Sequence, residues 1–164
     1  MPKPQKKTEK TEKSKEQIVA QNRSASYNYH LLERYEAGLV LHGTEVKALR
    51  QGKANIRDAY VDFKATGPWL VNAHIAQYMP GGPWNHEPLG SRKLLLHKNE
   101  IRKLIGKTVE KGMTLVPIRL YFKDGRVKVA VSLAKGKQDY DKRETIKRRE
   151  TDRETRAAVK GSRR

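Results

Sequence analysis

The sequence has 164 residues, with 36 Lys and Arg against 18 Asp and Glu, a formal charge of +18 and no cysteine. Without thiols the chain can form neither a disulfide framework nor a cysteine-ligated zinc site. Its apolar runs, such as residues 94–96, fall far short of the roughly 18 residues that a membrane-spanning helix needs, and its Lys- and Glu-rich N-terminus does not resemble a secretory signal, so a cytoplasmic protein is expected.

Positive charge extends along the whole chain. Residues 1–26 carry seven basic and three acidic residues (net +4), residues 27–134 carry seventeen and nine (net +8), and residues 135–164 carry twelve and six (net +6). A basic surplus in the middle and at both ends points to a polyanionic partner that is met by a folded surface and by tails together. An anionic membrane surface is the alternative, but neither end of the chain offers an amphipathic helix with a bulky apolar face.

The beginning of the chain is expected to be a flexible, disordered basic arm over residues 1–21. Residues 1–16 contain no aliphatic side chain beyond Met1 that could offset the entropy cost of ordering the backbone. A folded unit is therefore expected over residues 22–134.

Short strands and two short helices are expected in this unit. A helix is expected over residues 44–50, because Thr44 can cap it and Gly52 can stop it. A second helix is expected over residues 99–105, with Gly106 as its stop. Strand patterns begin at Tyr27 and, after a bend or bulge suggested by Gly38, recur at residues 39–41, 59–63 and 69–75, with a turn at residues 66–68 and a Gly- and Pro-rich loop at residues 79–92.

The clearest local pattern is a hairpin formed by residues 114–123 and 126–133. Asp124 and Gly125 suit a two-residue type I′ turn between them. Apolar residues alternate with Lys, Ala and Ser in the second strand, which predicts one buried face and one solvated face.

The end of the chain, residues 135–164, is expected to be a basic tail. Its only aliphatic or aromatic side chains larger than Ala are Tyr140, Ile146 and Val159, too few for a packed stripe. Yet it lacks proline and is rich in helix formers with oppositely charged pairs at helical spacing, such as Glu144 with Arg148. We interpret it as disordered when free and helical on a charged partner.

These elements favour a mainly β fold. Several short strands and two short helices in little over a hundred folded residues are typical of a small OB-like antiparallel barrel. Such barrels often bind nucleic acid, so by analogy with them nucleic-acid binding is expected of this chain.

Catalysis and metal binding find little support in the sequence. The histidines stand at positions 30, 42, 74, 86 and 97, and none forms a His-x-x-x-His or His-Glu-x-x-His pair. Only residues 85–87 put candidate ligands side by side, and a structural or RNA-contact role is favoured there over a metal role. Because nucleophile-elbow, P-loop and dinucleotide-binding motifs are also absent from the sequence, we expect no enzyme, no metal and no cofactor.

Several residues remain open between a structural and a binding role. Residues 92–98 join basic side chains to an apolar strand, which fits either a solvated strand edge or a phosphate-binding rim. On the first helix, Glu45, Lys47 and Arg50 could bind a partner or form only a charged outer face. The aromatic residues Tyr27, Tyr29, Tyr78 and Trp84 could stack on bases or belong to the core, and Trp84 is the best exposed candidate.

Taken together, the motifs resemble a known family. They include Glu-Ala-Gly-Leu at residues 36–39, Gly-Thr-Glu-Val-Lys-Ala-Leu-Arg at 43–50, Gly-Lys-Ala-Asn at 52–55, Arg-Lys-Leu-Leu-Leu-His at 92–97, Thr-Leu-Val-Pro at 114–117, Leu-Tyr-Phe-Lys at 120–123, Ala-Lys-Gly-Lys at 134–137 and Tyr-Asp-Lys-Arg at 140–143. In this order, over about residues 22–149, they resemble the SsrA-binding protein (small protein B) family of bacterial trans-translation.

The resemblance implies an RNA-binding adaptor, expected to be a monomer. Its barrel would bind the tRNA-like domain of transfer-messenger RNA, and its tail would enter the decoding centre and the empty mRNA channel of stalled ribosomes, in contact with rRNA. The RNA-binding residues expected are Glu36, Leu95 and His97 from the resemblance, Arg92 and Lys93 beside them, Lys98 from the basic strand, and Glu45, Lys47 and Arg50 as open candidates. The tail residues expected at the ribosome are Lys135, Gly136, Lys137, Tyr140, Asp141, Lys142 and Arg143.

One alternative to this adaptor stays open. A general ribosome-associated or single-strand-binding protein of OB type would bind many RNAs by charge alone, with a steep dependence on salt.

Overall fold

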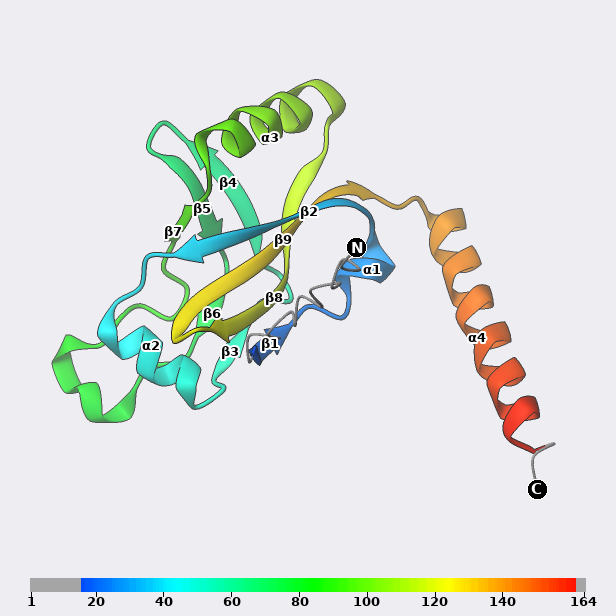
Figure 1. Ribbon diagram of the computed structural model, residues 1–164, viewed down its shortest axis with the longest axis horizontal. Coiled ribbons are helices and arrows are strands. Elements are labelled where there is room, and N and C mark those ends of the chain that lie inside the picture. Colours follow the sequence, from blue (N-terminus) through cyan, green and yellow to red (C-terminus); the bar gives the residue numbers. More distant parts are fainter. Residues whose placement is uncertain (1–15, 162–164) are drawn as a thin grey trace, which may run out of the picture.

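The strands close into a barrel. The computed structural model describes residues 16–161, apart from the side chains of Glu110 and Lys111. All but one of the seven strands of the main sheet form an antiparallel ring, in which each strand pairs with the next and the last pairs with the first: β8 (Thr114–Lys123), β4 (Tyr60–Lys64), β5 (Gly67–Val71), β7 (Arg92–Leu95), β2 (Tyr29–Leu39) and β9 (Arg126–Gly136). The predicted mainly β, OB-like fold is thereby confirmed (Figure 1).

Aliphatic side chains from the strands and from two helices fill the barrel. Leu115 and Val131 are examples from the strands, both fully buried. To the same cluster α2 (Gly43–Arg50) contributes Leu49 and α3 (Lys98–Lys111) contributes Leu104. A fully buried leucine side chain stabilises a fold by about 1.5–3 kcal/mol, so each helix is held by its apolar face. In Figure 1, α3 covers one end of the barrel and α2 lies toward the other.

The chain enters the barrel earlier than the sequence suggests. β1 (Gln17–Gln21) pairs with β8, whereas these residues were expected in the flexible arm. The strand is ordered because Val19 and Ala20 pack against the core. Next to it the buried Asn22 amide donates to the Pro117 carbonyl at 3.2 Å. Residues 1–15 of the expected arm lie outside the described residues.

The predicted hairpin is confirmed, but the face expected to be solvated is partly buried. Asp124 and Gly125 have φ angles of 52° and 76°, as a type I′ turn requires. Toward the end of β9, Ser132 is fully buried rather than solvated, as is Ala134 just beyond the predicted strand. Ala134 is covered by α1 (Ala25–Asn28), whose Ala25 packs with it and with Val116 in a second small cluster, and the Ser132 hydroxyl donates to the Glu33 carbonyl at 3.2 Å.

Both helices predicted inside the folded unit are present, with different ends. The N-cap of α2 is His42 rather than Thr44, and the His42 backbone N–H donates to the Glu45 carboxylate at 2.9 Å. The second helix, α3, passes through Gly106 and ends at Gly112, whose φ of 58° is left-handed. A glycine inside a helix lowers the stability of the helix but does not have to end it. Here the packing of α3 on the core, through Leu104, outweighs that cost.

The remaining connections depart from the predicted pattern in detail. β2 runs without a break through Gly38, and its register shift lies between Leu31 and Arg34. The turn before β5 uses residues 65–66, and the strand expected over residues 69–75 stops at Val71. Two short strands, β3 (Ala54–Asn55) and β6 (His74–Ile75), pair separately, and the loop over residues 79–92 begins with the 3₁₀ segment η1 (Met79–Trp84).

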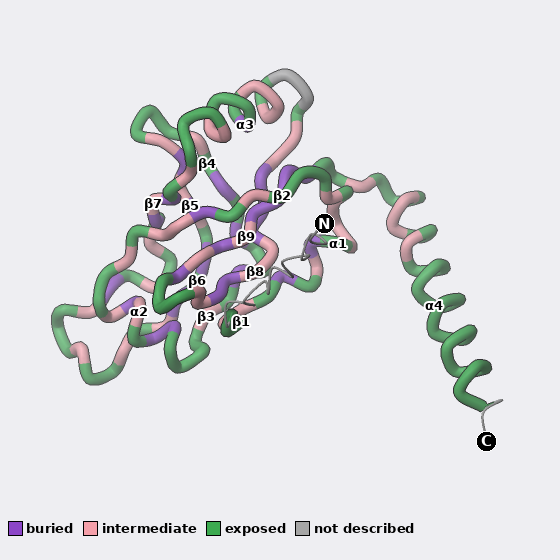
Figure 2. Tube along the Cα trace, in the orientation of Figure 1, coloured by how far each residue is buried: buried purple, intermediate pink, exposed green. Residues whose placement is uncertain are grey.

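The C-terminal helix projects from the barrel. β9 includes Lys135 and Gly136, two residues beyond the expected start of the tail, and α4 (Asp139–Gly161) follows with no buried residue. Figure 2 shows almost the whole of α4 as exposed, in contrast to the purple interior of the barrel. That this helix depends on a partner stays a prediction. Within residues 16–161, no helix is long and apolar enough to cross a membrane.

Candidate nucleic-acid interface

Two neighbouring strands, β2 and β7, present Glu36, Gly38 and Leu95 on the outer face of the barrel. Ala37 and Leu94 are buried in the core, so the residues on either side of them along β2 and β7 face outward. The register places Gly38 of β2 opposite Leu95 of β7 on one side and opposite Lys128 of β9 on the other. Side chains far apart in sequence therefore meet on one surface.

A groove of about 320 Å³ lies on this surface. Its lining includes Leu39, Leu41, Val46 and Leu95, with Gly38, Gly125, Arg126, Val127 and Lys128. Gly38 keeps the groove open, because a Cβ atom at this position would lie 3.3 Å from the Cβ of Leu95. An apolar floor with a basic rim suits a nucleotide, whose sugar or base meets the apolar side chains while its phosphate meets the cations.

The Glu36 carboxylate lies beside the groove with two donors of its own. The Tyr121 hydroxyl donates to it, and Lys123 Nζ lies 3.3 Å from its Oε2. The hydrogen bond from Tyr121, followed by those from Lys123, lowers the pKa of Glu36 against the opposing effect of burial. Burial, then the bond to Glu36, raises the pKa of Tyr121. Glu36 is thus an anion at neutral pH, able to accept a hydrogen bond from a base amino group or a ribose 2′-OH.

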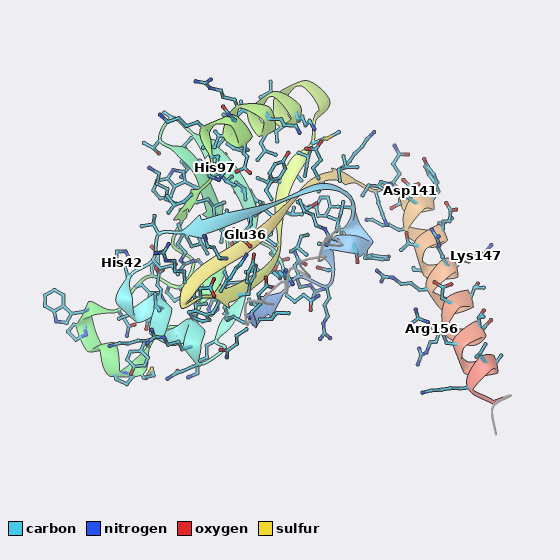
Figure 3. The ribbon with its side chains drawn as sticks, in the orientation of Figure 1. Glu36, His42, His97, Asp141, Lys147 and Arg156 are labelled. Atoms are coloured by element: carbon cyan, nitrogen blue, oxygen red, sulfur yellow. The ribbon has the colours of Figure 1, made fainter. Side chains whose placement is uncertain are left out.

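The basic candidates of β7 and the start of α3 lie along an adjoining stretch of surface. Lys93 is half-buried, whereas His97 and Lys98 are exposed at the beginning of α3. The His97 backbone N–H is bonded to the Glu100 carboxylate at 3.1 Å. In Figure 3, Glu36 lies near the middle of the barrel, with His97 toward the α3 end and His42 toward the α2 end.

Glu45 and Arg92 do not belong to this surface, which corrects their assignment from the sequence. Both side chains are almost fully buried, and Arg92 Nε donates to Glu45 Oε1 at 2.6 Å. The remaining guanidinium nitrogens donate to the backbone carbonyls of Ala73, Glu87 and Pro88. All of these partners lie within the chain, so the pair holds α2, β7 and the preceding loop together.

Lys47 and Arg50 lie on α2 but are not brought to the groove. Lys47 Nζ lies 5.3 Å from the centre of the Tyr78 ring, and Arg50 is exposed near the end of the helix. The α2 residue that does line the groove is Val46. The nine candidates from the sequence therefore lie in four separate places. They are Glu36 and Leu95 at the groove, Lys93, His97 and Lys98 along β7 and the start of α3, Lys47 and Arg50 on α2, and the buried pair Glu45 and Arg92.

Sequence reasoning missed Tyr121, Lys123, Arg126 and Lys128. All four lie in the hairpin, where the alternation of apolar and polar residues predicted only which side chains face outward. Their proximity to Glu36 and Leu95 follows from the pairing of β2 with β9 and β7, for which no local signal exists.

The tail candidates lie where α4 meets the barrel. Lys137 Nζ donates to the Ser26 carbonyl at 3.0 Å and to Thr145 Oγ1 at 2.9 Å. Asp141 Oδ2 lies 3.3 Å from His30 Nε2 and also accepts from the Gln138 backbone N–H at the start of the helix. The other tail candidates are more open: Arg143 is exposed, Tyr140 is 65% exposed, Lys142 is half-buried, and Lys135 and Gly136 are exposed at the end of β9.

Comparison with known proteins shows the family of the chain. A family model described as "SmpB protein" matches residues 19–161. The chain is 56% identical over 146 residues to an SsrA-binding protein of Trichodesmium erythraeum, covering 88% of this chain and 94% of the relative. It is 55% identical over 146 residues to one of Desulforudis audaxviator, covering 89% of this chain and 95% of the relative.

A solved structure resembles this chain at the level of the fold as well. It is described as "tmRNA-SmpB: a journey to the center of the bacterial ribosome", and it matches with a TM-score of 0.62 and 45% sequence identity. The match covers 77% of this chain and 92% of the other. With the barrel, the groove and these similarities together, the chain belongs to the SmpB protein family.

Proposed function

We propose that this chain is a non-catalytic RNA adaptor that binds transfer-messenger RNA and brings it to stalled ribosomes for trans-translation. The observation that carries the proposal is the groove beside Glu36, an apolar floor with a basic rim on the outside of an OB-like barrel. It is supported by relatives that are called SsrA-binding proteins and by the related tmRNA-SmpB structure on the ribosome. An adaptor of this kind works in the cytoplasm, and we expect it to act as a monomer.

The barrel binds the tRNA-like domain. Arg126 and Lys128 attract phosphates at the rim, and Leu95 offers an apolar contact at 55% exposure. Glu36 repels phosphates, so its presence among cations favours a donor from a base or ribose over a backbone contact. Lys93, His97 and Lys98 extend the site along β7 and the start of α3, and Lys47 and Arg50 are a separate basic area on α2.

The tail serves the ribosome. α4 is basic and exposed along most of its length, which suits rRNA of the decoding centre and the mRNA channel. The residues from Lys135 to Arg143 lie at the junction of the helix with the barrel, where a change in the direction of α4 would begin.

Glu36 provides the sharpest test of the barrel site. Binding of the full chain to transfer-messenger RNA and to an unstructured RNA of equal length is compared at about 150 mM salt, where screening is near physiological. Glu36→Gln is matched by Asp62→Asn, which removes one negative charge from an exposed position on β4. If charge alone governs binding, both variants bind RNA slightly more tightly. If Glu36 accepts a specific hydrogen bond, Glu36→Gln alone loses affinity, and only for transfer-messenger RNA.

A second experiment tests whether the barrel and the tail have separate functions. Replacing Asp141, Lys142 and Arg143 together is expected to leave RNA binding intact and to abolish peptide tagging on stalled ribosomes. Tail changes that abolish RNA binding, with barrel changes that do nothing, would contradict the assignment. Equal binding of the unaltered chain to both RNAs, collapsing as salt rises, would favour a general RNA-binding protein instead.

A further inference from the structure

Trp84 is the most exposed large apolar residue on the described surface, at 87%. Its side chain has no hydrogen-bond or cation–π partner among residues 16–161. The second tryptophan of the chain, Trp69, has both, because its Nε1 donates to Thr66 at 2.9 Å and Lys64 Nζ lies 5.5 Å from its ring. An indole usually buries its faces or bonds its N–H group, so Trp84 leaves unused both features that tryptophan brings to a contact.

The loop that carries Trp84 is held firmly at its base. The Asn85 side chain accepts from the Tyr78 backbone N–H at 3.0 Å and donates to the Tyr78 carbonyl at 2.7 Å, which closes the loop. The buried His86 ring bonds Thr44 Oγ1 at 2.9 Å and the Ile75 carbonyl at 3.0 Å. These contacts tie the end of η1 to α2 and to β6.

The shape of this loop is not explained by burial. η1 contains no buried residue. Gly82 nevertheless adopts φ 54° and ψ −135°, a conformation that other residues rarely reach. A Cβ atom on Gly81 would lie 3.0 Å from Thr44 Cγ2, so the backbone also approaches α2 closely. The sequence thus specifies a loop of defined shape, and this loop holds the Trp84 indole in solvent.

The surroundings of Trp84 identify the kind of partner. At the base of the loop, Lys47 covers the Tyr78 ring, and Arg50 is exposed on the same helix. An open indole on a loop that packs against the helix carrying these two cations suits a polyanion with flat rings of its own, which describes RNA. Met79, at 80% exposure, is the only other large apolar residue exposed in the described η1 segment, too little apolar surface to anchor a membrane.

We propose that Trp84 is a base-stacking site, on which one unpaired nucleobase of the bound RNA lies while Lys47 and Arg50 face neighbouring phosphates. The inference rests on the proposed function and deepens it by adding a second contact outside the groove. In Figure 1 the η1 loop and α2 lie at the opposite end of the molecule from α4, so this contact belongs to the barrel and not to the tail.

Affinity for transfer-messenger RNA in a set of full-length variants tests the stacking. Trp84→Ala is expected to weaken binding between about fivefold and a hundredfold, the range measured for removal of one stacking residue. Trp84→Phe is expected to restore most of the affinity because it keeps a π face, and Trp84→Leu is not. Met79→Ala is the matched control from the same loop and is expected to bind as the unaltered chain does.

Fluorescence supplies a readout that does not depend on affinity. The chain has two tryptophans, so Trp69→Phe leaves Trp84 as the only indole. Its emission is expected to be quenched by transfer-messenger RNA and unchanged by a fully paired, blunt RNA duplex that offers no unstacked base. Quenching of equal size by the duplex would overturn stacking on an unpaired base.

The outcomes separate the two proposals. If the unaltered chain prefers transfer-messenger RNA and Trp84→Ala binds equally well, the stacking site is wrong and the function stands. If Trp84→Leu matches Trp84→Phe, the contact is apolar and the stacking inference is overturned. If the unaltered chain shows no preference between RNAs, the proposed function fails, and the fluorescence of Trp84 still decides whether it stacks on unpaired bases.

Discussion

Two opposite charges lie inside the protein, and their position decides what they do. Arg92 and Glu45 are almost fully buried, and the guanidinium donates to one carboxylate and three carbonyl groups. Such a pair adds little net stability compared with apolar side chains of the same shape, but removing one partner leaves the other buried and uncompensated. Both residues therefore hold α2 and the loop before β7 in place.

Replacing Arg92 distinguishes a structural role from an RNA contact. Arg92→Met is expected to lower the free energy of unfolding by about 3–5 kcal/mol, because Glu45 loses its partner in the interior. Lys93→Met, the neighbouring change on β7, is expected to change stability by no more than about 0.5 kcal/mol. Denaturant unfolding measures both. An Arg92→Met protein of unchanged stability that no longer binds RNA would return Arg92 to the interface.

At the scale of elements, α3 is fastened to β2 by Glu33. Its carboxylate accepts from Lys107 and Tyr35, and Lys103 Nζ lies 3.0 Å away. These interactions, with the Lys107 bond first, lower the pKa of Glu33 from 4.5 to about 2. Since the pKa is lower in the folded state, the stabilisation is present above about pH 4.5 and is lost as the pH falls toward 2.

Neutralising Glu33 should therefore change the acid response of the fold. Glu33→Gln is expected to melt below the unaltered chain at pH 6, by a small margin because the site is exposed, and the two melting temperatures should converge as the pH approaches 2. Thermal unfolding followed by circular dichroism from pH 7 to pH 2 measures this. A difference in melting temperature that does not change with pH would mean that the side chain acts through packing instead.

Two glycines in and after α3 have opposite requirements. Gly106 is inside the helix with nothing within 4 Å of an added Cβ, so Gly106→Ala is expected to raise the free energy of unfolding by about 0.5–1 kcal/mol. Gly112 has a φ of 58°, so Gly112→Ala is expected to lower it by about 1 kcal/mol. Chemical denaturation of the pair measures both signs. If Gly106→Ala destabilises instead, the helix ends at Gly106 in solution, as the sequence pattern suggested.

At the scale of the whole molecule, what could be predicted from the sequence divides by distance along the chain. The Asp124–Gly125 turn and the helix at residues 43–50 depend on neighbouring residues, and both were predictable. The Glu45–Arg92 pair and the approach of Gly38 to Leu95 depend on residues 47 and 57 positions apart. No local pattern distinguishes a charged residue that will be buried by the fold from one that remains on the surface.

The groove and most of the basic tail lie in different parts of the molecule, the barrel and α4. α4 has no buried residue and meets the rest of the fold over its first half, through Asp141 and Arg149, with a further contact from Lys137 just before the helix. The barrel is closed without it, since β9 ends at Gly136 and pairs with both β2 and β8. Removal of α4 should therefore leave the groove and the Trp84 loop unchanged while removing a large share of the basic surface.

A truncation after Gln138 makes that separation measurable. It removes ten basic and six acidic residues, so the slope of log affinity against log salt for unstructured RNA is expected to become shallower, by about 0.7 for each phosphate that the tail neutralises in the full chain. The preference for transfer-messenger RNA is expected to persist, because the groove remains. A full-length chain with Arg148, Arg153 and Arg156 changed to Gln keeps the length of the tail and should show part of the same change in slope. Loss of the preference on truncation, with retention in the Gln variant, would place specificity in the tail helix rather than in the barrel.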